Sequence, residues 1–143
     1  TMVNLSPTGL AFDLAGDLLV TDPTNRRVWR IDSSTRIATV IAGGGEGTGE
    51  NVPPRSISVT ARSVAVDSTG GILLGAGTLR FVDPLTGLIR TVAGDDNGVP
   101  GGDGMDARTV RLGVTGIVAT PEGNVLIGDS ATRSVRVIRG PFP

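Results

Sequence analysis

The chain contains no cysteine, histidine, tyrosine or lysine, and only 3% of its 143 residues are aromatic. The absence of cysteine excludes disulfides, thiolate metal sites and cysteine nucleophiles. Without histidine, the chain also lacks the commonest general base and the commonest ligand of transition metals. Any chemistry performed by this protein would therefore depend on carboxylates, arginines, hydroxyl groups or a hard metal ion.

The charge and the hydrophobicity of the chain limit which partners and which membrane segments it can have. The 13 basic residues, which are all arginine, and the 14 acidic residues leave a net charge of −1. This balance gives no general attraction to nucleic acid or to an anionic membrane. No apolar run approaches the roughly 20 residues that span a bilayer, and residues 1–4 show no basic leader before an apolar stretch. We therefore expect a soluble chain without a signal peptide, a membrane-spanning segment or a nucleic-acid partner.

What the chain does contain is one pattern that occurs three times. The copies begin at residues 9, 63 and 116, so their starts lie 54 and then 53 residues apart. Each copy has two short apolar segments joined by a turn with glycine, and then a segment that alternates apolar and polar residues. Short segments of this kind, bounded by turns, predict β-strands. The strand segments fall within 10–20, 27–32, 37–43, 64–74, 78–83, 88–94, 117–127 and 134–139.

A fixed period of this size indicates a stacked or radial array, because one unit alone cannot bury its apolar face. Each complete unit is predicted to be a four-stranded antiparallel meander, which is the plan of a β-propeller blade. The predicted fold is therefore all-β, with three such units in a single domain, the last of them incomplete. The units are predicted to span residues 9–62, 63–115 and 116–143.

Several motifs are distinctive in composition. They are Thr8-Gly9-Leu10-Ala11-Phe12-Asp13, Gly16-Asp17-Leu18-Leu19-Val20-Thr21-Asp22, Asn25-Arg26-Arg27-Val28, Ile31-Asp32, Thr91-Val92-Ala93-Gly94 and residues 101–107. Together they resemble the NHL-repeat family of propellers. The second unit departs from the pattern by losing two residues near 75–77, and the third has Thr120 where the others have aspartate. The resemblance implies a ring of commonly six blades, used for protein binding, RNA binding or, in some members, lyase or lactone chemistry.

Three blades do not close a ring, and an open array would expose two apolar blade faces. Two chains could pair head-to-tail about a twofold axis as a homodimer with six blades. The chain could instead be a piece of a longer propeller, or its three units could form a small open solenoid. The missing fourth strand of the last unit could come from residues 1–5, in cis or from a neighbouring chain, or that unit could have only three strands.

The loops after the second and fourth strands of each unit are expected to share one face, where we place the candidate site. The candidate ligand-binding residues on this face are Asp22, Asn25, Arg26, Asp103, Asp106, Asp129 and Arg133. Oxygen ligands at close spacing could hold Ca²⁺, and the metal candidates are Asp95, Asp96 and Asn97. The plainer interpretation is that these acidic residues cap turns. Asp13 and Asp67 are likewise interpreted as turn caps, and Trp29 as a residue that packs between blades.

No nucleophile with its base, phosphate-binding loop or zinc motif occurs in the sequence. We therefore expect a binding scaffold, assembled from two chains, whose long-loop face recognises a protein, a peptide or a glycan. The alternative is a calcium-type, metal-dependent hydrolase or lyase of the six-bladed kind, which the absence of histidine disfavours. RNA binding is a third interpretation, and the acidic balance disfavours it. No cofactor is expected, with Ca²⁺ as the open alternative.

Overall fold

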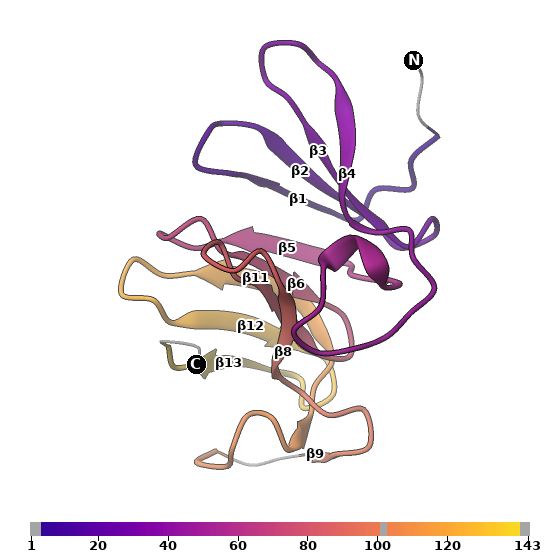
Figure 1. The fold of residues 1–143 in the computed structure, drawn as a ribbon. Helices are drawn as coiled ribbons and strands as arrows, with labels where there is room; N and C mark the ends of the chain where they lie inside the picture. Colours follow the sequence, from indigo (N-terminus) through magenta and orange to yellow (C-terminus); the bar gives the residue numbers. More distant parts are fainter. Residues whose placement is uncertain (1–3, 101–102, 141–143) are drawn as a thin grey trace.

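The computed structural model describes residues 4–100 and 103–140 (Figure 1). In this part of the chain, three antiparallel sheets follow one another, with a small parallel pair of strands between the second and the third. Blade 1 is a four-stranded sheet of β1 (Gly9–Phe12), β2 (Leu18–Asp22), β3 (Arg27–Ile31) and β4 (Ala38–Gly43). Blade 2 is a four-stranded sheet of β5 (Ser63–Val66), β6 (Ile72–Gly75), β7 (Leu79–Val82) and β8 (Ile89–Ala93). Each is a meander in sequence order, as the repeat predicts.

Blade 3 is a three-stranded sheet of β11 (Val114–Ala119), β12 (Val125–Asp129) and β13 (Ser134–Ile138). No fourth strand pairs with β13 among the residues that the structure describes. The connection from blade 1 to blade 2 contains a short 3-10 helix, η1 (Pro54–Ser56). The connection from blade 2 to blade 3 contains the parallel pair β9 (Val99–Pro100) and β10 (Val110–Arg111). The prediction of three all-β units with an incomplete last unit is confirmed.

The first turns of blades 1 and 2 are built in the same way, whereas blade 3 has Thr120 at the equivalent position. The carboxylate of Asp13 accepts hydrogen bonds from the backbone amides of Ala15 and Asp17, both at 2.9 Å. Asp67 does the same in blade 2, where it accepts from the amides of Thr69 and Gly71 at 2.8 Å. Both aspartates therefore act as the turn caps that the sequence suggests.

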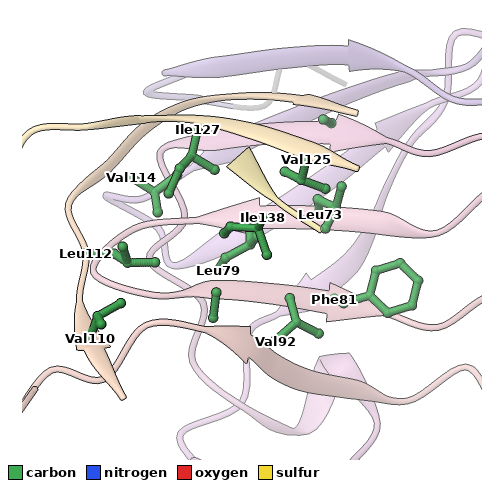
Figure 2. Packing of buried hydrophobic residues seen from close by; sticks show 12 residues of the cluster. Leu73, Leu79, Phe81, Val92, Val110, Leu112, Val114, Val125, Ile127 and Ile138 are labelled. Carbon is green, nitrogen blue, oxygen red and sulfur yellow. The ribbon is translucent and has the colours of Figure 1, made fainter. Parts of the chain in front are cut away.

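The core lies between blades rather than within them. One buried cluster joins blade 1 to blade 2, and a second joins blade 2 to blade 3 (Figure 2). Leu73 belongs to the second cluster, whereas its neighbours Ile72 and Leu74 belong to the first. Successive residues of a strand point to opposite faces of its sheet. A blade that is covered on both faces must therefore be apolar at consecutive positions, which explains the run 72–74.

The two end blades each have an outer face that no other blade of the chain covers. On blade 1 this outer face includes Leu10 and Phe12, which are 63% and 70% exposed, and Trp29, which aligns with Leu10 through Val20. The outer face of blade 3 carries a second exposed apolar group, consisting of Val118, Val135 and Val137. Apolar patches of this kind mark interaction surfaces.

Residues 4–8 run along blade 1 rather than along β13. The amide of Thr8 donates to the carbonyl of Thr21 at 3.1 Å, as the amide of Arg62 donates to the carbonyl of Gly75 at 2.8 Å. The side chain of Asn25 also donates to the carbonyl of Asn4 at 3.1 Å. Residues 4–8 therefore correspond to the end of a connection between blades. Of the segment 1–5 considered for the missing strand, residues 1–3 lie outside the described part.

Candidate functional site

A hollow of about 640 Å³ opens at the face formed by the long loops. The first strands of the three blades, β1, β5 and β11, are the inner edges of their sheets and lie side by side, with β5 between the other two. The hollow lies beside these three strands. The turns after the second strands of the blades and the segments before the first strands form its wall. The lining residues are Thr8, Pro23, Thr60, Arg62, Ala76, Gly77, Gly113, Val114, Thr115 and Ser130.

The repeat itself places three of these residues. Thr8, Arg62 and Thr115 each occupy the position just before the start of a unit, and all three line the hollow. Our sequence interpretation did not single them out. The signal was available, because equivalent positions of a radial repeat lie at equivalent distances from its axis. The residues before the unit starts therefore gather at the same opening.

The chemistry of the hollow is that of hydroxyl groups and one cation. Thr8, Thr60, Thr115 and Ser130 contribute hydroxyls, and among the described lining residues only Arg62 is charged. No carboxylate belongs to this described lining, although Ca²⁺ and Mg²⁺ sites are built from oxygens that usually include carboxylates. The lining therefore does not fit a divalent cation, and it suits a polar or anionic ligand better.

Asp22, a predicted ligand-binding residue, is fully buried, and its carboxylate accepts hydrogen bonds from the following turn and from the segment before β1. Its carboxylate accepts from the side-chain amide of Asn25 at 2.6 Å, from the backbone amide of Asn25 at 3.2 Å and from the amide of Ser6 at 3.4 Å. Burial alone would raise the pKa of Asp22, but the hydrogen bonds from Asn25 and Ser6 lower this pKa below its usual value. These contacts make Asp22 the residue that ties the β2–β3 turn to the segment before β1.

Asp129 plays the equivalent part in blade 3, where it is 2% exposed. It accepts from the amides of Gly113 at 2.9 Å and Ala131 at 3.0 Å, and from the hydroxyl of Thr132 at 2.8 Å. The guanidinium of Arg136 lies 3.5 Å away. Burial acts to raise the pKa of Asp129, but the hydrogen bonds from these groups outweigh it and hold the pKa below the usual aspartate value.

Arg26 and Arg133 sit at equivalent places in the turns that follow β2 and β12. Their φ angles are 54° and 55°, in the left-handed region, so both residues shape the backbone of their turns. The turn of blade 2 is shorter, with the amide of Ala76 donating to the carbonyl of Thr78 at 3.0 Å. The pairing encloses six residues, 22–27, between Thr21 and Val28 but only three, 76–78, between Gly75 and Leu79. Blade 2 therefore lacks three residues of this turn rather than the two expected from the sequence, and it has no counterpart of Arg26.

The acidic residues of the second connection are spread along it. Asp95 accepts from the amide of Asn97 at 2.9 Å, and Asp106 pairs with the guanidinium of Arg108 at 3.2 Å. In the described ranges, no group of three or more acidic side chains lies close enough together to hold a metal ion. The structure therefore brings Asp22 together with Asn25, but it does not gather the predicted site residues into one cluster.

Solved structures share this architecture. A Bacteroides thetaiotaomicron protein of unknown function matches 90% of the chain with a TM-score of 0.75 and 18% identity. The chain folds as blades of a β-propeller. An auxiliary nutrient binding protein from the same organism matches 90% of the chain with a TM-score of 0.63 and 18% identity. A gluconolactonase from Xanthomonas campestris matches 87% with a TM-score of 0.58 and 16% identity.

The chain spans only about a third of the length of these propeller-like structures, at 34%, 36% and 35% of them. Because the chain matches only about a third of each larger structure, its three blades are consistent with a partial propeller that needs a partner. No family model matches the chain, and no curated protein matches it. Among the described residues, no helix is long and apolar enough to cross a membrane.

Proposed function

We propose that the protein is a binding scaffold of the NHL type, in which a second copy completes a six-bladed ring and the axial hollow receives the ligand. The hollow is the observation that carries this proposal. It lies beside the first strands of the three blades and combines hydroxyl groups with one guanidinium. Its described lining contains neither a carboxylate nor a nucleophile paired with a base, which favours binding over catalysis.

The two outer faces support completion of the ring by a second copy. On blade 3, Leu126 stands at the position of Leu73, and Val118 and Val135 stand at the positions of Ala65 and Leu79. The three residues in blade 2 are buried against the next blade. In a twofold ring, the outer face of blade 3 packs on the outer face of blade 1 of the other copy, and the reverse contact forms on the opposite side.

The chain is expected to have a solution mass near twice 14.5 kDa when light scattering is measured. Phe12→Asp places a charge on the outer face of blade 1 and should shift the protein to a monomer. Leu85→Asp is the matched control, because Leu85 lies in the β7–β8 turn and is 94% exposed. A wild-type chain that remains a folded monomer would rule out the two-chain ring.

The ligand we propose is a glycan or peptide, either alone or as part of a protein, that carries an anionic group. In a twofold ring, two Arg62 side chains face the same axial opening, and guanidinium groups bind carboxylates well. The surrounding hydroxyls can donate to and accept from the polar groups of such a ligand. Acidic oligosaccharides and peptides with free carboxyl termini, each with a neutral or amidated counterpart, are suitable probes.

Arg62→Gln is expected to weaken binding of a carboxylate probe about tenfold or more, because one charge-assisted contact is lost. Titration calorimetry with the free and amidated forms of the same peptide measures the effect. Arg36→Gln is the control, since Arg36 lies in the β3–β4 turn on the opposite face. Equal affinity of wild type and Arg62→Gln would contradict the assigned site, and turnover of a lactone probe would contradict the scaffold.

A further inference from the structure

The connection between blades 1 and 2 covers the outer edge of the fourth strand of blade 2. The amide of Asn51 donates to the carbonyl of Ile89, and the amide of Ile89 donates to the carbonyl of Val52, both at 2.9 Å. The carboxylate of Glu50 accepts from the amide of Thr91 at 2.5 Å and from its hydroxyl at 2.7 Å. The strand β8 is therefore held between β7 on one side and residues 50–52 on the other.

The connection between blades 2 and 3 is built on the same turn. In the first connection, both the amide and the hydroxyl of Ser56 donate to the carbonyl of Pro53, at 3.0 and 2.7 Å. In the second, both the amide and the hydroxyl of Thr109 donate to the carbonyl of Asp106, at 3.0 and 2.9 Å. The next residue of each connection then enters a parallel pairing. Ser56 and Thr109 are therefore equivalent residues of the two connections. They lie 53 residues apart, as do the starts of the last two units at 63 and 116.

This match places residues 103–105 where residues 50–52 stand in the first connection. Asp103 takes the position of Glu50, and Gly104 and Met105 take the positions of Asn51 and Val52. In blade 2, the strand β8 lies between such a segment and β7. In the described part of blade 3, β13 ends its sheet, so no strand lies between β13 and residues 103–105.

A groove of about 510 Å³ occupies this place. One wall is formed by residues 135–139 and the other by residues 103–105 and Ala107, while Val110, Leu112 and Ile127 lie at its base. The base is apolar, and these three residues belong to the buried cluster between blades 2 and 3 (Figure 2). Among the described residues β13 is an edge strand, and the backbone amides and carbonyls of an edge strand can pair with a further strand. The groove thus offers hydrogen bonds along one wall and apolar contacts below.

We propose that this groove binds an extended segment of a separate polypeptide, which adds as the fourth strand of blade 3 and runs antiparallel to β13. The fourth strands of the other blades define its chemistry. They end in Ile41-Ala42-Gly43 and Val92-Ala93-Gly94, and the glycines have φ angles of 80° and 91°. The segment therefore carries a β-branched residue, alanine and glycine, with a threonine amide and hydroxyl in reach of Asp103.

The segment comes from outside the described strands of this chain, because each of those strands already belongs to a blade or to the β9–β10 pair. Residues 4–8 are bound along blade 1, as the contacts of Thr8 and Asn25 show. The proposal does not rest on the closed ring. The groove lies at the rim, since β11 is adjacent to β5 near the axis and β13 is the strand of blade 3 farthest from it.

A labelled peptide with the sequence of residues 87–95 tests the proposal by fluorescence anisotropy with the intact protein. We expect saturable one-to-one binding with a dissociation constant below about 1 mM. The same peptide with proline at the threonine position should not bind, because proline removes the amide donor and resists strand pairing. Absence of saturable binding, equal binding of the proline peptide, or a dimer that dissociates as the peptide binds would overturn the proposal.

Two further measurements test the same proposal if the free peptide binds weakly. Asp103→Asn should weaken peptide binding about tenfold, whereas Asp83→Asn, in an exposed turn of blade 2, should leave it unchanged. A chain extended at its carboxyl end by the sequence of residues 84–94 should unfold at a higher temperature than the same extension with proline in place of its threonine. Equal unfolding temperatures of the two extended chains would also overturn the proposal.

Discussion

Leu73→Ala is expected to lower the free energy of unfolding by about 2–5 kcal/mol. Leu73 has 0% exposure and lies in the cluster between blades 2 and 3 (Figure 2). Its removal leaves a cavity lined by two sheets, which are joined by backbone hydrogen bonds and cannot collapse freely around the gap. The loss is measured as the shift of the urea midpoint at one fixed protein concentration, because association also contributes to apparent stability.

Leu85→Ala is the control for this substitution. Leu85 is 94% exposed in the turn between β7 and β8, so its truncation should change the free energy of unfolding by less than about 0.5 kcal/mol. Similar losses for the two variants would show that the interblade cluster does not dominate the stability of the chain.

Asp129→Ala is expected to cost about 3 kcal/mol or more of unfolding free energy, as for a broken buried ion pair. The substitution leaves the amides of Gly113 and Ala131 without their carboxylate acceptor, and it removes the counter-charge of Arg136. Urea unfolding at neutral pH measures the loss. Asp83→Ala, which removes a cap from an exposed turn, should cost about 1 kcal/mol or less.

The pH dependence provides a second readout for Asp129. Its pKa is lower in the folded protein than the usual value of an aspartate, so the carboxylate stabilises the fold fully above the unfolded pKa. This contribution is lost as the pH falls through the folded pKa. Wild type should therefore lose stability between about pH 5 and pH 2 more steeply than Asp129→Asn. Parallel acid limbs for the two proteins would contradict this role.

The strand pattern was readable because it depends on local chemistry. Glycines at the turns and alternating or continuous apolar segments reflect which faces of a strand are covered, and the repeat showed the same arrangement three times. The continuous apolar run 72–74 is typical of a buried strand, and the structure buries its members in two different clusters. The missing fourth strand of the last unit was also visible from the repeat alone.

The candidate site was harder to predict, because the fate of a carboxylate depends on what lies across the fold. Asp22 is reached by Ser6 and Asp129 by Gly113, and each contact spans 16 residues of sequence. Both carboxylates are buried and accept hydrogen bonds from these distant amides. The axial opening is lined by Thr8, Arg62 and Thr115 instead. These residues have no distinctive motif, so only their equivalent positions before the unit starts could have revealed them.

The sequence by itself determined the strands of the blades, the number of blades and the incompleteness of the third, because turn and face preferences act over a few residues. It did not indicate the β9–β10 pair in the second connection. Only the tertiary structure decided which side chains reach the axis and which carboxylates are buried by hydrogen bonds. It also decided that residues 103–105 face β13 across a groove. These features depend on how connections of about 20 residues fold back onto neighbouring blades, and no local preference encodes that path.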